Sequence, residues 1–260
     1  MSAVGCSRLQ VAKRGVCDVN EVILVDPMDW NEKIFAYCER GVDPSFWAEP
    51  LNAISNIAFI LVALRALSLW NSQRHPSAGI AELALIVLIF VIGTGSFLFH
   101  TYATRWAMLT DTLPISLFML LYLIFATRRF LGANWFVTTL SVLVFLGAAA
   151  ASEIDLCDGG RCLNGSLGYV PALAALMIIG GALQGKDHPA SSALLWAAAI
   201  FALSLVFRSS DFLFCPSTLI RPGWRAGTHS IWHFLNAIVI YLLIRAAILH
   251  GMRDRNPIET

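Results

Sequence analysis

Long apolar stretches, separated by short polar or Gly/Pro-bearing turns, run through most of the chain from about residue 50 onward. A helix needs about 20 mostly apolar residues to cross the hydrocarbon core of a bilayer. The pattern predicts seven such helices, the sixth being the shortest. They cover Ala53–Trp70, Ile80–Phe99, Ala107–Ala126, Trp135–Ala151, Leu167–Leu183, Ala193–Val206 and Ser230–Leu249. We therefore expect an all-α polytopic membrane protein folded as a seven-transmembrane helix bundle.

The residues before the first span carry charged side chains throughout, so the uninterrupted apolar stretch of a secretory signal is not found there. The first span must then act as the insertion signal. We expect three parts: an N-terminal extramembrane segment over residues 1–48, a seven-span domain over 49–250 that carries the chemistry, and a C-terminal tail over 251–260.

Composition supports the membrane assignment. Hydrophobic residues make up 57% of the chain, whereas soluble domains average about 45–50%. Charged residues make up only 13%, whereas soluble domains average about 25%. The formal net charge of +1 gives no field that would attract nucleic acid. No feature of the sequence indicates an obligate protein partner, so the expected partner is a membrane lipid.

The cysteines bear on orientation, because seven spans put the termini on opposite sides of the membrane. All six cysteines fall on the N-terminal side, and disulfides persist in oxidising compartments. We therefore expect the N-terminus outside, in a periplasm or organelle lumen, and the tail in the cytoplasm. Scattered free thiols are an equally good explanation of the pattern. Basic residues flank the spans on both sides, so the positive-inside rule does not decide.

Ionisable groups at membrane depth are costly, which makes them candidates for function. Ser96 and His100 are four residues apart at the end of the second span and share one helical face. His229 and His233 have the same spacing at the start of the seventh. Asp111 is the only acid in the third span and lies at its start. The topology brings all of these positions to the N-terminal side of the membrane, in one layer.

This layer has the composition of a hydrolytic metal site. Catalytic zinc takes three protein ligands and keeps one position open, and His100, His229 and His233 supply three nitrogens. Asp111 can accept a proton from an attacking water, and Ser96 can donate to a developing oxyanion. The set indicates hydrolysis of an amide or an ester. Polar Asn52, Ser55 and Asn56 enter the same layer from the first span.

Each group also has an ordinary structural explanation. A lone histidine at a helix end is usually structural, Asp111 can be a helix N-cap, and Ser96 can bond back to its own helix. Their common layer favours a metal site over these alternatives. A receptor or scaffold that holds zinc structurally and responds to a lipid is the rival class, and the position of Asp111 discriminates between the two. A transporter would place such groups near the midplane. The remaining histidines, on the opposite side, are expected to be solvated: His75, His188 and His250.

The spaced set resembles the alkaline ceramidase family, and more widely the seven-span hydrolases that include the progestin and adipoQ receptors. It consists of GTGSFLFH ending at His100, Asp111 eleven residues later, and HSIWH from His229 to His233. The YCER…EPLNAISN segment resembles the ceramidase form specifically. The resemblance implies that the three histidines bind zinc, that Asp111 is the general base and that Ser96 steadies the scissile carbonyl.

By the same resemblance the substrate is ceramide or a related N-acyl lipid, which is cleaved to a sphingoid-type base and a fatty acid. The helices would surround a lipid-accessible cavity. Aromatic side chains that could line it and hold acyl chains are Phe59, Phe97, Phe99 and Trp232.

The resemblance also implies a calcium site in the segment before the first span. Glu39 and Glu49 match acidic positions of that site, Ala36 and Gly41 replace an acid and an amide ligand, and Asp43 is a possible substitute. Two disulfides are implied as well. Cys38 would pair with Cys215, and Cys157 with Cys162.

Overall fold

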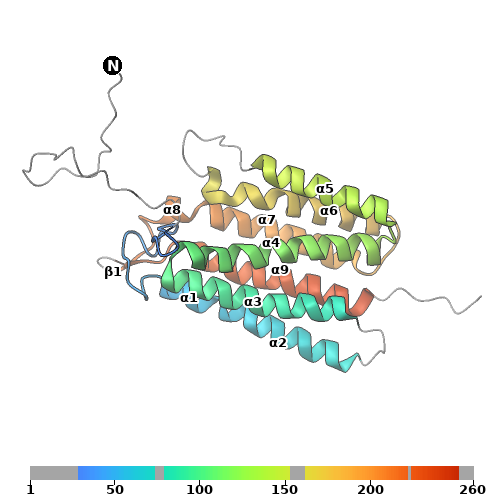
Figure 1. The fold of residues 1–260 in the computed structure, drawn as a ribbon, viewed down its shortest axis with the longest axis horizontal. Helices are drawn as coiled ribbons and strands as arrows, with labels where there is room; N and C mark the ends of the chain where they lie inside the picture. Colours follow the sequence, from blue (N-terminus) through green and yellow to red (C-terminus); the bar gives the residue numbers. More distant parts are fainter. Residues whose placement is uncertain (1–28, 74–78, 153–161, 222–223, 252–260) are drawn as a thin grey trace, which may run out of the picture.

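The computed structural model describes residues 29–73, 79–152, 162–221 and 224–251. Within these ranges, seven helices are long and apolar enough to cross a membrane. They lie side by side as an elongated bundle (Figure 1), which confirms the all-α, seven-span prediction. The chain is an integral, multi-pass membrane protein.

The spans in chain order are α1 with α2, α3, α4 with a π-helical turn η1, α5, the 3-10 turn η2 with α6, α7 and α9. Two short elements lie between α7 and α9: the helix α8 and a hairpin of β1 and β2. The elements of the spans are α1 (Pro50–Ser55), α2 (Ile57–Ser72), α3 (Ile80–Tyr102), α4 (Arg105–Phe125), η1 (Ala126–Phe130), α5 (Trp135–Ser152), η2 (Cys162–Tyr169), α6 (Val170–Gln184), α7 (Ser191–Ser209) and α9 (His229–His250). The short elements are α8 (Asp211–Phe214), β1 (Leu219–Arg221) and β2 (Trp224–Arg225).

The sixth span is longer than predicted. The expected Ala193–Val206 becomes the 19-residue helix α7, because its terminal serines are satisfied within the structure. The Ser191 hydroxyl donates to the carbonyl of Gly180 at 3.0 Å, and the Ser210 hydroxyl donates to that of Val206 at 2.6 Å. Hydroxyl groups bonded in this way do not end a helix in an apolar environment.

The core lies along α3 and α9. These helices have 50% and 56% of their most apolar windows buried, against 11% for α5 at the edge of the bundle. Ile89 of α3 and Ile244 of α9 are fully buried at 0% exposure. The outward faces are also apolar, with Leu143 and Ile178 exposed. An apolar outer face suits a lipid solvent, whereas water would disfavour it.

Helices α3 and α4 approach closely at Gly95. A Cβ atom added there would lie 1.9 Å from the carbonyl oxygen of Thr110, well inside van der Waals contact. Small residues permit such backbone contact between membrane helices. Because Ser96 follows Gly95 and Asp111 follows Thr110, this contact brings the two predicted site residues to the same helix interface.

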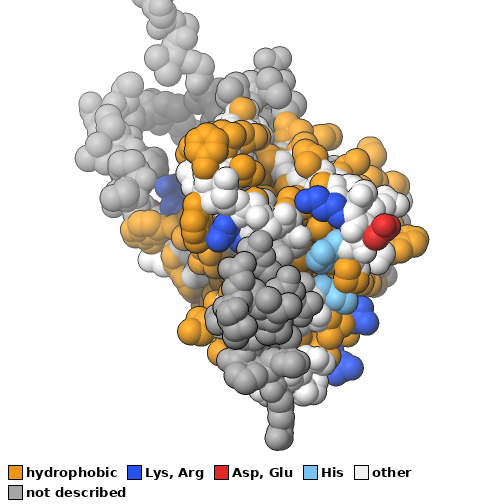
Figure 2. Space-filling view, turned by 90° about the vertical axis from the view of Figure 1, so that its right-hand side faces the viewer, with side chains coloured by type: hydrophobic (Ala, Val, Ile, Leu, Met, Phe, Trp, Pro, Cys, Tyr) orange, Lys and Arg blue, Asp and Glu red, His pale blue; other side chains and the backbone are white. Residues whose placement is uncertain are grey.

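At the opposite end of the bundle, most of the charged side chains in view are basic. Figure 2 looks onto that end and shows Lys, Arg and His side chains among apolar ones. His188 and His250 belong to it and are partly exposed, as expected. The third histidine expected there, His75, lies outside the described residues.

We expect Gly95→Ala to lower the midpoint of thermal unfolding in detergent by several degrees. Overpacking a close helix contact costs about 1–3 kcal/mol or more, because the obstructing atom is backbone. Gly147→Ala in α5 is the matched control, since a Cβ there meets no heavy atom within 4 Å. Equal midpoints for the two variants would contradict the close contact.

Candidate active site

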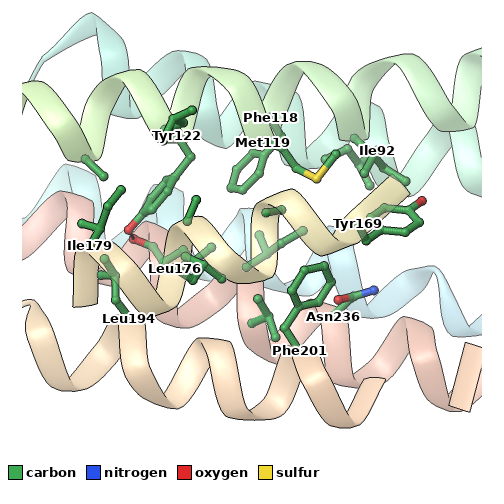
Figure 3. Close-up of a pocket in the computed structure, with 18 of the residues that line it drawn as sticks. Ile92, Phe118, Met119, Tyr122, Tyr169, Leu176, Ile179, Leu194, Phe201 and Asn236 are labelled. Carbon is green, nitrogen blue, oxygen red and sulfur yellow. Dashed lines mark hydrogen bonds between the residues drawn. The ribbon is translucent and has the colours of Figure 1, made fainter. Parts of the chain in front are cut away.

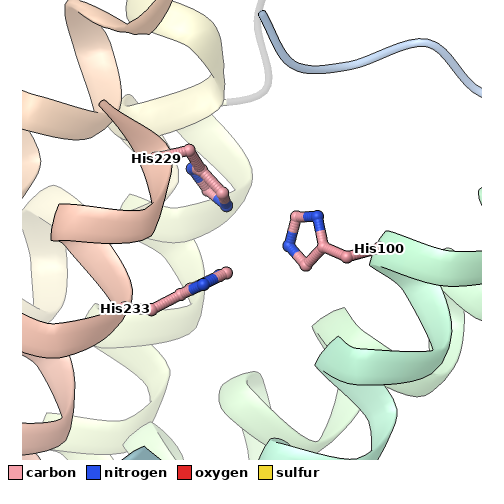
Figure 4. A group of neighbouring side chains, drawn as sticks. All are labelled: His100, His229 and His233. Carbon is pink, nitrogen blue, oxygen red and sulfur yellow. The ribbon is translucent and has the colours of Figure 1, made fainter. Parts of the chain in front are cut away.

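Three histidines meet at the end of the bundle that carries the N-terminal segment (Figure 4). His100 comes from the last turn of α3, and His229 and His233 from the first two turns of α9. Their ring centroids are 5.2, 4.9 and 4.6 Å apart, and one ligand nitrogen of each lies within 4.8 Å of the others. All three are buried. Within the described ranges this is the single group of three His, Cys, Asp or Glu able to hold a metal ion.

Hydrogen bonds fix the tautomers of two of these rings. The Nδ1–H of His100 donates to Oε2 of Glu49 at 2.6 Å. Nδ1 of His233 lies 2.6 Å from the Ser55 hydroxyl, which itself donates to the carbonyl of Asn52. The Ser55 oxygen must therefore accept from His233 Nδ1–H.

The consequence is that both rings carry their proton on Nδ1 and keep a lone pair on Nε2. These two Nε2 atoms are buried and have no hydrogen-bond partner among the described residues. Buried polar nitrogens are rarely left unpaired. Two such nitrogens facing a third imidazole have the donor set and orientation that a metal such as zinc requires.

His229 is held by its ring and its backbone. Its ring stacks on Tyr37 and Trp232, with centroids 3.7 and 5.0 Å away. The Oδ1 of Asp211 accepts from the N–H groups of Thr228 and His229, at 2.7 and 3.0 Å. A carboxylate at the start of α9 satisfies amides that the helix leaves unpaired and stabilises its positive end.

The same aspartate joins α9 to the N-terminal segment. Oδ2 of Asp211 accepts from the backbone N–H of Cys38 at 2.8 Å. Gly227 makes room for this arrangement, since its φ is +65° and a Cβ there would lie 2.3 Å from Oδ1 of Asp211. Asp211 is fully buried.

Asp111 faces the histidines and does not cap its helix. Helix α4 begins at Arg105, and its N-cap is Thr104, whose hydroxyl accepts from the N–H of Ala107 at 3.4 Å. The N-cap explanation of Asp111 is therefore wrong. The carboxylate is 6% exposed, interacts electrostatically with His100 and has a buried Oδ1 without a partner among the described residues.

Ser96 lies beside the Asp111 carboxylate, close to it but outside regular hydrogen-bond geometry. Its hydroxyl makes no hydrogen bond to its own helix, so the back-bonding explanation does not hold either. The structure thus brings together all five residues predicted for the metal and catalytic site. Asn52, Ser55 and Asn56 are buried in the same layer, as the shared helical face predicted.

The residues expected to bind calcium are not gathered into one ligand group. Glu39 accepts from the N–H groups of Leu51 and Asn52 at 2.7 and 2.8 Å, capping the first turn of α1. Asp43 is exposed, and its side chain accepts from the N–H of Ser45. Glu49 is bound by an arginine and by His100. In the part of the chain that is described, these acidic side chains do not come together as a group of three or more ligands.

The two buried glutamates differ electrostatically. Burial raises the pKa of Glu39 to about 7, although its two backbone hydrogen bonds act in the other direction. Burial acts to raise the pKa of Glu49 as well, but His100, Asn52 and Arg40 together hold it below its usual range. Glu49 is therefore the carboxylate that stays ionised beside the histidines.

A disulfide joins Cys38 to Cys215, the pair that the resemblance implied, with Cα atoms 5.6 Å apart. It ties the N-terminal segment to the connection before α9, alongside the hydrogen bond of Asp211. Cys157 lies outside the described residues, as does the side chain of Cys162, so the second pairing stays a prediction.

An apolar cavity runs along the bundle between α4, α6, α7 and α9 (Figure 3). Phe59 and Trp232 line it, as expected, and both pack against the ring of His233. Phe97 and Phe99 do not line it, because their positions on α3 turn them towards the N-terminal segment. Phe99 packs on Tyr37, and Phe97 lies near Trp47.

Four residues of the site were not predicted: Tyr37, Arg40, Asp211 and Arg208. The Arg208 guanidinium lies 5.9, 5.2 and 4.9 Å from the ring centroids of Tyr37, Tyr169 and Trp232. The sequence signal for Arg208 was its position in the last turn of an apolar span, because a charged side chain at membrane depth is costly and is usually functional. Tyr37 and Arg40 lie in the segment before α1, and Asp211 begins the four-residue helix α8, so spacing carries no such information for them.

Comparison with known proteins gives one positive result. The family model described as Ceramidase matches residues 32–258, which is most of the chain and includes every described residue of the site. None of the curated proteins compared with the chain matches it. This family implies a hydrolase acting on the amide bond of ceramide, and hence a lipid substrate. The chain therefore belongs to the ceramidase family.

Proposed function

We propose that the protein is a zinc-dependent ceramidase that cleaves ceramide, or a closely related N-acyl lipid, into a free amine and a fatty acid. The observation that carries the proposal is the buried group of three imidazoles beside Asp111. Two of the imidazoles have Nε2 atoms, and Asp111 has an Oδ1 atom, without a hydrogen-bond partner among the described residues. In this proposal residues 49–250 form the catalytic domain, with contributions from the segment before it.

Zinc is the metal that best matches the donor set. Three neutral imidazoles in a buried site suit zinc, whereas calcium and magnesium prefer oxygen ligands. Structural zinc sites usually close with four protein ligands, but the group here has three. Three ligands leave one position for water or substrate, which favours catalysis over a receptor or scaffold with structural zinc.

His100, His229 and His233 would hold the zinc ion, which would supply a Lewis acid able to lower the pKa of water to about 7 and to polarise a carbonyl group. The residues of the chain handle the protons. Asp111 accepts a proton from the attacking water, whose oxygen adds to the carbonyl carbon. The C–N bond then breaks, and Asp111 returns the proton to the leaving nitrogen. Ser96 donates a hydrogen bond to the carbonyl oxygen as negative charge develops there.

The apolar cavity is the proposed site for the acyl chain. Its lining runs from Ile115 on α4 to Ala126 at the start of η1, and from Trp232 to Leu243 on α9. At 1.5 Å per residue each run covers about 16 Å, a length that suits a fatty acyl chain. Trp232 adjoins His233, so a chain in the cavity would present its amide to the metal site.

The proposed orientation puts the N-terminal end of the bundle outside and the tail in the cytoplasm. The disulfide between Cys38 and Cys215 supports it, because disulfides persist in oxidising compartments. Basic residues lie at both ends of the bundle, so the positive-inside rule does not decide between the two orientations. Those at the opposite end include, in the described chain, Arg128, Arg129, Lys186 and Arg245.

We expect His233→Ala to abolish both zinc binding and ceramide hydrolysis, because two imidazoles are too few to retain the metal. Metal analysis of the purified protein and product release from ceramide are the measurements. His250→Ala, at the other end of the same helix, is the control and keeps both properties. Full zinc retention by His233→Ala would remove this residue from the site.

We expect Asp111→Asn to keep zinc and lower turnover by about 10²–10⁴-fold, the usual contribution of a general base. The amide is isosteric but takes up no proton. Turnover and zinc content are measured on the same preparation. Unchanged hydrolysis would exclude Asp111 as the base, and loss of zinc would mean that it supports the metal instead.

We expect Leu176→Trp to reduce hydrolysis of long-chain ceramides more than that of short-chain ceramides, because the larger side chain fills the cavity. Leu176 lines the cavity, whereas its neighbour Met177 is 57% exposed on the lipid face of α6. Met177→Trp is therefore the matched control. Equal losses for all chain lengths would argue against this cavity as the acyl site.

A further inference from the structure

Arg40 is buried at 3% exposure, and every N–H of its guanidinium group is bonded to oxygen. Nε donates to Oε1 of Glu49 at 2.5 Å. Nη1 donates to the carbonyls of Asp43 and Ser45 at 3.0 and 2.8 Å. Nη2 donates to those of His100 and Thr101 at 2.9 and 3.2 Å. These five bonds use the full donor capacity of an arginine.

The acceptors come from three separate parts of the chain. The carbonyls of His100 and Thr101 belong to the last turn of α3, where a helix leaves its carbonyls unpaired and its dipole negative. The carbonyls of Asp43 and Ser45 belong to the loop before α1, and Glu49 is the N-cap residue of α1. One buried cation therefore holds together the loop, the start of the first span and the end of the second.

Glu49 transmits this arrangement to the proposed metal site. Its Oε1 accepts from Arg40, and its Oε2 accepts from Nδ1 of His100 at 2.6 Å and from the side-chain amide of Asn52 at 3.0 Å. A carboxylate bonded to the far nitrogen of a metal-binding imidazole sets the ring orientation and raises its basicity. Arg40 fixes that carboxylate from the other side.

A shell of one carboxylate and four backbone carbonyls around a cation is the kind of environment that calcium uses. Here the guanidinium occupies its centre. The other two acidic residues expected to bind calcium are engaged elsewhere, since Glu39 caps α1 and Asp43 is exposed. The described residues therefore do not fit a calcium ion in this segment.

We propose that Arg40 is a built-in cation that does the structural work of a bound calcium ion, so that the protein folds and acts without calcium. Arg40 is then a positioning residue for His100, acting through Glu49. The positioning role rests on the proposed zinc site, whereas the independence from calcium does not.

The first test uses the wild-type protein in calcium-depleted buffer supplied with zinc. Calcium chloride is titrated to millimolar concentration while the midpoint of thermal unfolding, bound zinc and ceramide hydrolysis are measured. None of the three is expected to change, and metal analysis is expected to find no stoichiometric calcium. A midpoint that rises with calcium, or calcium bound at one ion per chain, would overturn the inference.

The second test removes the guanidinium. Arg40→Ala leaves an oxygen-lined space beside Glu49, so we expect a lower midpoint and about 10–100-fold weaker zinc retention, both partly restored by calcium or by guanidinium ion at millimolar concentration. Arg105→Ala is the matched control, because its side chain also bonds the N-terminal segment, through Glu32, but at the surface. It is expected to keep the wild-type zinc affinity.

Arg40→Lys keeps the charge but cannot make five hydrogen bonds. It is expected to fold even where Arg40→Ala does not, to bind zinc with intermediate affinity and to gain nothing from calcium. Wild-type zinc affinity in both variants would overturn the positioning role. If the wild-type protein holds no zinc, the proposed function is contradicted instead. The calcium titration of the unfolding midpoint would still show whether Arg40 takes the structural place of calcium.

Discussion

The site depends on hydrogen bonds that fix the protons of buried imidazoles. Glu49 holds the proton of His100 on Nδ1, and Ser55 does the same for His233, so that both Nε2 atoms are left without a hydrogen-bond partner among the described residues. A buried lone pair is costly when nothing binds it. The bundle therefore maintains a preorganised metal-binding group, and the helices around it are arranged to keep these three rings together.

The segment before the first span completes the site as much as the spans do. Tyr37 stacks on the ring of His229. Cys38 forms a disulfide with Cys215, and its backbone N–H donates to Asp211. Arg40 links the loop to α3 by donating to the carbonyl of His100. A division of the chain at residue 48 would therefore cut through the site, because residues on both sides of it contribute contacts. The proposed chemistry requires the extramembrane segment to be folded against the bundle, in a compartment where its disulfide persists.

The sequence was sufficient to predict the spans and the layer of the site. Span ends follow from hydropathy, and the direction of each span then assigns His100, Asp111 and His233 to one side of the membrane. Asp211 and Arg40 could not be predicted in this way, because each has partners among backbone groups far along the chain, such as the N–H of Cys38 and the carbonyl of Thr101. For a related reason, matching Glu39 and Glu49 to acidic positions of a calcium site did not reveal that the Arg40 guanidinium lies among the Glu49 carboxylate and four backbone carbonyls.

The central claim is that three imidazoles and one exchangeable oxygen ligand surround a zinc ion. X-ray absorption at the zinc edge of the purified, active protein tests it most directly. The account predicts three imidazole nitrogens and one further light ligand at about 2.0–2.1 Å, with the light ligand replaced when a competitive inhibitor binds. Absence of zinc, a sulfur ligand, or a closed set of four protein ligands would contradict it.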